Sequence, residues 1–225
     1  MSRLIGIFGG TFDPIHLGHL QSIKLLDDTC DFDLIHWVLS ARPPHKDQVS
    51  ATIEHRFAML QLALQELPTY LPDDTEISRN TASYTFDTVQ QFRHLYSQDT
   101  LCLIIGGDSL QKLHTWYRYD ELIDLVHLVV MHRPGYDFEV PDYLKERLVK
   151  AKQLSDYHCG KLVLFNKSEF DISSTELRQT IMQEFPTKSM QSLVQQYIAE
   201  PVIEYIHQHR LYRNSLLYTS PSPRD

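Results

Sequence analysis

Short apolar segments alternate with longer amphipathic segments along most of the chain. The apolar segments show no strict alternation of polar and apolar residues, as expected of parallel strands that are buried on both faces. They cover residues 4–8, 34–39, 101–105, 127–131 and 161–165. The helical patterns between them cover residues 18–27, 53–66, 84–95, 120–125 and 143–154. This alternation predicts an α/β fold with a doubly wound parallel sheet.

Two further helices are predicted after the last strand, over residues 174–184 and 189–209. Pro201 should divide the second one, because proline does not continue a helix. We expect a single domain over residues 1–213 with a helical C-terminal cap. Residues 214–225 show no periodicity, and their last ten, LLYTSPSPRD, resemble a translated sequencing adapter. We interpret them as a disordered or non-native tail and exclude them from the fold.

Composition narrows the class of protein. A chain of 225 residues that is 42% hydrophobic can bury a core, and its formal net charge of -8 argues against a protein that coats a nucleic-acid polymer. Its three cysteines form no CxxC pair, which favours a reduced, cytoplasmic protein. The first apolar segment is too short to span a membrane and lacks the form of a signal peptide, so we expect no membrane association.

The loop after the first predicted strand carries the strongest chemical pattern, GGTFDPIHLGH over residues 9–19. Its two leading glycines let backbone amides approach a phosphate. His16 and His19 share one face of a helix start, where two imidazoles and the positive helix end suit the charge of a triphosphate. We expect Gly18 to leave space for a base or a ribose. HxxH could instead bind a metal, but no third ligand stands at a suitable spacing.

This pattern resembles the HxGH nucleotidyltransferase superfamily. The resemblance implies that the loop binds ATP and that the two histidines stabilise the phosphate being transferred. The ATP-binding residues implied in this loop are Gly9, Gly10, Thr11, Phe12 and Gly18.

A second pattern, ISSTELR over residues 172–178, follows the last predicted strand. Ser173 or Ser174 can cap a helix and Glu176 can complete a capping box, which would leave Arg178 solvated. The same helix start and the arginine could also clamp phosphates. The pattern resembles the ISxxxxR signature of the same superfamily. That resemblance implies that Ile172, Ser173 and Arg178 act on ATP.

Four segments between these patterns bear on the acceptor of the transferred group: PPHK (43–46), NTASYT (80–85), GGDSL (106–110) and TWY (115–117). Lys46 could meet a phosphate or be an ordinary surface lysine. Asp108 could bind a ribose or only complete a turn. Trp116 could stack on a pyridine ring or belong to the core.

Together these segments and RPGY (133–136) resemble the bacterial nicotinate-nucleotide adenylyltransferase family over residues 4–213. The resemblance implies a Rossmann-like nucleotidyltransferase domain with His16, His19 and Arg178 as catalytic residues. Further ATP-binding residues would be Lys46, Gly106 and Arg133. The residues that would bind nicotinate mononucleotide are Ser83, Tyr84, Thr85, Asp108, Trp116 and Tyr117, with the ring on Trp116 and its carboxylate near the amides of Thr85 and Tyr117.

The implied reaction transfers AMP from ATP to nicotinate mononucleotide and yields nicotinate adenine dinucleotide (deamido-NAD) and pyrophosphate. We expect Mg²⁺ to arrive with ATP rather than in a protein metal site, and a homo-oligomer is compatible with the sequence. Three alternatives stay open: phosphopantetheine as the acceptor, nicotinamide mononucleotide in place of the acid, and a non-catalytic nucleotide sensor on the same fold.

Overall fold

A computed structural model describes residues 2–42, 49–79, 82–132, 139–166, 172–182 and 194–213. Its centre is a six-stranded sheet in the order β3-β2-β1-β4-β5-β6, in which every neighbouring pair is parallel. The strands are β1 (Leu4–Gly10), β2 (Leu34–Leu39), β3 (Tyr70–Asp73), β4 (Thr100–Gly106), β5 (His127–Met131) and β6 (Leu162–Phe165). The order reverses between β1 and β4, and ligands bind beyond the carboxyl ends of the strands at such a point. The predicted doubly wound parallel sheet is confirmed.

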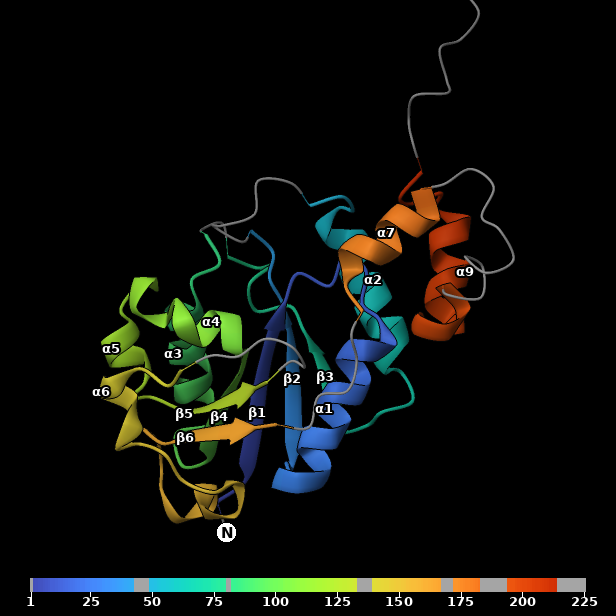
Figure 1. The fold of residues 1–225 in the computed structure, drawn as a ribbon. Coiled ribbons are helices and arrows are strands. Elements are labelled where there is room, and N and C mark those ends of the chain that lie inside the picture. Colours follow the sequence, from blue (N-terminus) through green and yellow to red (C-terminus); the bar gives the residue numbers. More distant parts are fainter. Residues whose placement is uncertain are drawn as a thin grey trace, which may run out of the picture.

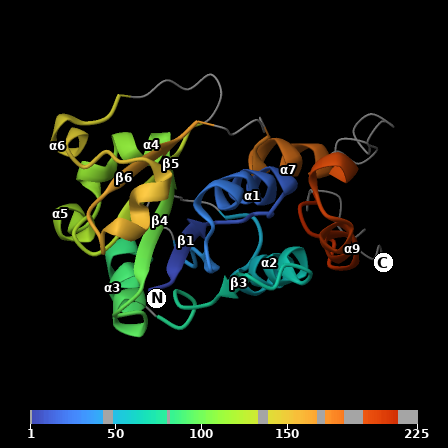
Figure 2. The ribbon, with the colours of Figure 1, turned by 90° about the horizontal axis from the view of Figure 1, so that it is seen from below.

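Helices cover both faces of the sheet (Figure 1, Figure 2). On one face lie α1 (Leu17–Cys30), α2 (Ile53–Leu64), α7 (Ser174–Met182) and α9 (Glu200–Gln208). On the other lie α3 (Thr85–Leu95), α4 (Gly107–Gln111), α5 (Tyr119–Leu122) and α6 (Asp142–Lys145). The chain also forms two 3₁₀ turns, η1 (Leu113–Thr115) and η2 (Ala151–Asp156).

The strands supply both cores in alternation. In β1, Leu4 and Phe8 belong to the core under α1 and α2, whereas Ile5 and Ile7 belong to the core under α3. Because both faces are covered, both sets of side chains are apolar, which is why the sequence pattern of the strands is continuous.

The structure differs from the prediction at both edges of the sheet. The edge strand β3 was not predicted, because its sequence YLPD is short and Pro72 removes a backbone donor, which is tolerated at an edge. The continuous helix predicted over residues 143–154 is wrong. There the chain forms α6 and η2, and between them Val149 donates its amide to Leu162 O (2.9 Å) while Leu162 donates to Arg147 O (2.8 Å). This pairing covers the exposed edge of β6, which sequence periodicity does not report.

The division of the last helix is confirmed. Ala199 caps α9 and Pro201 stands in its first turn, where the missing amide costs no helical hydrogen bond. Val202 and Ile206 of α9 are buried in the core that α2 also covers. Within the described ranges, no helix has the length and apolarity needed to cross a membrane.

Candidate active site

The loop after β1 and the start of α7 lie against each other at the carboxyl end of β1 (Figure 1). Arg178 donates from Nη1 to the carbonyl oxygen of Asp13 (2.6 Å), and Ser174 donates from Oγ to Pro14 O (3.0 Å). These contacts join residues that are 165 and 160 positions apart in the sequence. The two sequence patterns that predicted a nucleotide site therefore meet in one place.

His16 and His19 form a stacked pair at the start of α1. Their ring centroids are 3.7 Å apart with an interplanar angle of 28°. His16 is the N-cap of α1 and is only 5% exposed, and its amide donates to Nδ1 of His19 (3.3 Å). Because Nδ1 of His19 accepts this bond, the proton of a neutral His19 ring lies on Nε2. His19 is thereby oriented as a donor through Nε2.

Phe12 supports the histidine pair from the core. Its backbone is left-handed (φ 45°), and the residue is 2% exposed. The ring lies 5.4 Å from that of His19 and 5.7 Å from that of Trp37. Gly10 has no side chain where a Cβ would stand 2.6 Å from the Phe12 ring. The Phe12 ring thus packs between the core and the histidine pair.

The structure explains the glycine at position 18 by close packing, not by space for a ligand as the sequence suggested. A Cβ at this position would lie 2.7 Å from Cγ2 of Ile172 and 3.0 Å from Nδ1 of His16. The space that we expected to hold a base or a ribose is therefore occupied by Ile172, the first residue of the second pattern. Glycine is required here because α1 and the segment before α7 approach each other closely.

Arg56 of α2 was missed by the sequence analysis. It is 1% exposed and donates to three carbonyl oxygens, those of Thr11 (2.9 Å), Ser40 (2.8 Å) and Ala41 (3.2 Å). Burial lowers the pKa of its guanidinium, but an arginine stays charged at neutral pH. Arg56 thus fixes the loops after β1 and β2 relative to each other. Its position on the buried stripe of α2, with Leu60 and Leu64, was the available signal.

Ser173, one of the two predicted candidates, caps α7. Its Oγ accepts from the amide of Glu176 (3.2 Å), and both its amide (2.9 Å) and its hydroxyl (2.7 Å) donate to Oε2 of Glu176. These bonds lower the pKa of the Glu176 carboxyl, which is therefore ionised at neutral pH. A phosphate bound at Ser173 would have to displace this carboxylate.

The segments predicted to bind the acceptor also lie together. The exposed rings of Tyr84 and Tyr117 have centroids 5.0 Å apart. Ser83 is buried, and its Oγ accepts from the amide of Arg42 after β2 (3.0 Å). Thr85 begins α3 directly after Tyr84. The half-buried Trp116 packs partly against the core under α3, so it has a core contact without being enclosed.

Gly106 and Asp108 stand at the end of β4, but not in a flexible loop. Gly106 caps the short helix α4, and a Cβ on Gly106 would lie 2.5 Å from Oδ1 of Asp108. Asp108 itself is exposed in the first turn of this helix. The carboxylate therefore lies at the carboxyl edge of the sheet, held by an ordered element.

Comparison with known proteins identifies the family of this chain. A cytidylyltransferase-like family profile matches residues 7–180. A protein of Pseudomonas syringae pv. tomato with the curated name "Probable nicotinate-nucleotide adenylyltransferase" is 36% identical over 95% of this chain and 95% of its own length. A protein of Escherichia coli O139:H28 with the same name is 36% identical over 95% of this chain and 100% of its own. The chain belongs to the nicotinate-nucleotide adenylyltransferase family.

Solved structures show the same fold. The nicotinic acid mononucleotide adenylyltransferase of Plasmodium falciparum, complexed with NaAD, aligns with a TM-score of 0.73 at 20% identity. The alignment covers 94% of this chain and 98% of the other. The same enzyme complexed with APC aligns with a TM-score of 0.71. This nicotinate-nucleotide adenylyltransferase family member therefore carries the fold that the sequence predicted, a Rossmann-like nucleotidyltransferase sheet.

Lys46 and Arg133, predicted to bind ATP, lie outside the described residues, as does the predicted tail at 214–225. Among the residues that the structure does describe, His16, His19, Gly18, Ile172, Ser173 and Arg178 are brought together through the contacts above.

Proposed function

We propose that this chain transfers AMP from ATP to nicotinate mononucleotide and releases pyrophosphate and deamido-NAD. The observation that carries the proposal is the meeting of Arg178 with the loop of His16 and His19, at the same edge of the sheet as the paired segments of Tyr84 and Tyr117. The names of the relatives state this acceptor, and a solved structure of the same fold was complexed with NaAD.

In the proposed reaction an oxygen of the acceptor's 5′-phosphate attacks the α-phosphorus of ATP in line. The new bond forms as the bond from the α-phosphorus to the bridging oxygen of pyrophosphate breaks. Such transfers depend on positioning and on charge neutralisation more than on covalent help from the protein. No covalent enzyme intermediate is part of the proposal.

We assign the donors by their place in the site. His19, oriented through Nε2, and His16 would stabilise the charge on the α-phosphate and its bridging oxygen. Arg178 would hold the polyphosphate beside the loop, together with the backbone of Ser173. The same role is proposed for Lys46 and Arg133, which lie outside the described residues.

Mg²⁺ enters the proposal as part of the MgATP substrate. Among the described residues, no three His, Cys, Asp or Glu side chains gather as a metal site would require. Mg²⁺ commonly keeps water and phosphate oxygens as ligands, so a substrate-borne ion needs few protein ligands. It would neutralise charge on the departing pyrophosphate.

The acceptor would lie between the segments that carry Tyr84 and Tyr117. We propose that its pyridine ring stacks on Trp116 and that its carboxylate meets the amides of Thr85 and Tyr117. Asp108, exposed at the end of β4, would bind the ribose. A cytoplasmic location and a homo-oligomer remain parts of this proposal that rest on the sequence.

The acceptor is tested by giving the purified full chain MgATP with one candidate at a time. We expect pyrophosphate and a stoichiometric dinucleotide with nicotinate mononucleotide. Nicotinamide mononucleotide and phosphopantetheine serve as the competing acceptors. The proposal is wrong if phosphopantetheine or the amide is used in preference to the acid, or if ATP binds and no acceptor yields pyrophosphate, as for a nucleotide sensor.

A further inference from the structure

Tyr212 lies near the C-terminal end of the described chain and contacts the loop after β1, near the N-terminal end. Its hydroxyl donates to Oδ1 of Asp13 (2.8 Å), a contact between residues 199 positions apart. Both residues are buried, with exposures of 8% for Tyr212 and 4% for Asp13. Burial and the neighbouring Asp13 carboxylate raise the pKa of the Tyr212 hydroxyl, so it remains a donor at neutral pH.

The Asp13 carboxylate contacts groups from three other segments of the chain. Besides the Tyr212 hydroxyl, it accepts from the amides of Ser50 (2.7 Å) and Ala51 (3.1 Å), which precede α2. Arg178 Nη1 lies 3.9 Å from Oδ2. A buried carboxylate is stabilised only when such partners compensate for lost water, so the position of Asp13 depends on all of them.

Asp13 in turn holds Arg178. The Arg178 guanidinium donates from Nη1 to the carbonyl oxygen of Asp13 (2.6 Å) and from Nη2 to Oγ1 of Thr175 (3.2 Å). Within the part of the chain that the structure describes, Asp13 is thus the one residue that hydrogen-bonds to both Tyr212 and Arg178. A shift of Asp13 would move the guanidinium that we propose to bind the polyphosphate.

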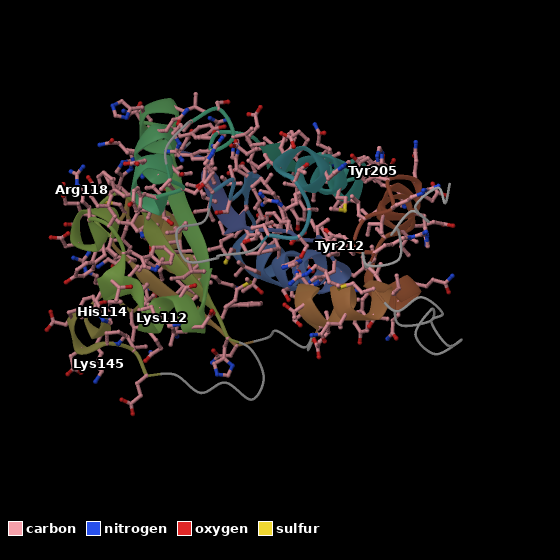
Figure 3. All side chains as sticks on the ribbon, turned by 90° about the horizontal axis from the view of Figure 1, so that it is seen from above. Lys112, His114, Arg118, Lys145, Tyr205 and Tyr212 are labelled. Atoms are coloured by element: carbon pink, nitrogen blue, oxygen red, sulfur yellow. The ribbon has the colours of Figure 1, made fainter. Side chains whose placement is uncertain are left out.

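The backbone after α9 is shaped to bring Tyr212 to this place. Arg210 (φ 52°) and Tyr212 (φ 60°) both adopt the left-handed conformation although neither is glycine. A left-handed backbone is strained in residues that carry a Cβ, and strain of this kind persists only where surrounding contacts hold it. Seen from above, Tyr212 lies on the side of α9 toward α1 and α7 (Figure 3).

We infer that Tyr212 is a positioning residue for ATP, which acts through Asp13 on Arg178. The last turn of the chain is then part of the nucleotide site rather than only a cover of the core. This inference rests on the proposed function, because it assigns Tyr212 to the ATP half of that reaction and not to the acceptor half.

The test compares Tyr212→Phe with wild type, since phenylalanine keeps the buried ring and removes only the hydroxyl. We expect kcat/KM for ATP to fall about tenfold, equivalent to about 1.4 kcal/mol, with the KM for nicotinate mononucleotide changed by less than about twofold. Tyr70→Phe is the matched control, because Tyr70 is a buried tyrosine whose hydroxyl donates to Asp27 (3.0 Å), in a contact between β3 and α1. It should leave both substrate constants unchanged.

A double-mutant cycle with Arg178→Lys shows whether the effect passes through Arg178. If it does, Tyr212→Phe should cost much less in the Arg178→Lys background than in wild type. The inference is overturned if Tyr212→Phe changes only the melting temperature, if it raises the KM of both substrates equally, or if its effect is the same in both backgrounds. An inactive wild-type chain would instead contradict the proposed function.

Discussion

The ring of His19 is held in place before any substrate binds. The amide of His16 donates to its Nδ1, the His16 ring stacks on it, and the edge contact with Phe12 supports it from the core. A donor that is already oriented stabilises developing charge without a cost of reorganisation. At the scale of single residues, this ring is the group whose removal should affect chemistry most.

His19→Ala should reduce turnover by about 100- to 1000-fold, the usual cost of losing one oriented transition-state donor. Far-ultraviolet circular dichroism and the melting temperature should stay near wild type. His94→Ala is the control, because His94 is exposed on α3 and its ring Nδ1 hydrogen-bonds to Gln90 O (2.8 Å) of the same helix. Near-normal turnover of the His19 variant would remove this histidine from the proposed mechanism.

Gly18→Ala should destabilise the fold, because the added methyl group would meet Ile172 at 2.7 Å. Overpacking of this kind costs about 1–3 kcal/mol. Gly9→Ala is the control for stability, since a Cβ there meets nothing within 4 Å. Urea unfolding measures both, and adding Ile172→Ala should recover part of the loss. Equal stability of the two glycine variants would contradict the close approach of Ile172.

Site residues that belong to a sequence motif were predicted. Those whose role depends only on packing were missed. His16, His19 and Arg178 stand in recognisable strings, so their meeting could be expected. Arg56 could not be assigned, because a buried arginine is understood only when its three carbonyl partners from distant loops are known. Sequence showed that position 18 is glycine, but not that Ile172 is the reason.

At the scale of elements, the segments before α3 and after η1 form the acceptor side of the proposed site. Trp116→Ala should raise the KM for nicotinate mononucleotide, since stacking of a base on an aromatic ring is worth about 1–3 kcal/mol. The KM for ATP should change little. Initial rates with each substrate varied in turn give both constants. If the KM for ATP rises instead, Trp116 does not bind the ring.

Helices and strands could be predicted from the sequence where the pattern of apolar residues determines the structure. The strands β1, β2, β4, β5 and β6 were predicted because their burial on both faces leaves a continuous apolar signal. Edge pairing leaves no such signal, so β3 was not predicted. For the same reason the segment that covers the edge of β6 was taken for a helix.

At the scale of the whole molecule, His127 should make the stability of the fold depend on pH. It is fully buried in β5, where Nδ1 accepts from the amide of Lys161 (3.0 Å) and Nε2 donates to Tyr157 O (3.1 Å). Burial lowers its pKa below the ordinary value of 6.5. The unfolded chain therefore binds this proton at a higher pH than the folded chain, and stability falls as the pH drops below about 6.5.

The melting temperature should accordingly decline between pH 7.5 and pH about 5, and decline less steeply in His127→Gln, whose amide does not titrate in this range. Differential scanning calorimetry at several pH values compares the two slopes, and the difference between proteins isolates His127 from the other histidines. Parallel slopes would show that His127 does not contribute.

The family and the architecture could be predicted from the sequence, and both predictions are confirmed. The way in which distant segments come together to form the site could be predicted only in part. The meeting of both ends of the chain at Asp13 depends on how α7 and α9 pack, which no local pattern encodes. The roles proposed for Lys46 and Arg133 remain predictions.

The most direct test of the central claim follows the phosphates of ATP. The full chain is given nicotinate mononucleotide with ATP labelled at either the α- or the γ-phosphorus, and the products are separated. Adenylyl transfer predicts that the α label appears in the dinucleotide and the γ label in pyrophosphate. A γ label on the acceptor, or its release as inorganic phosphate with no dinucleotide, would contradict the account.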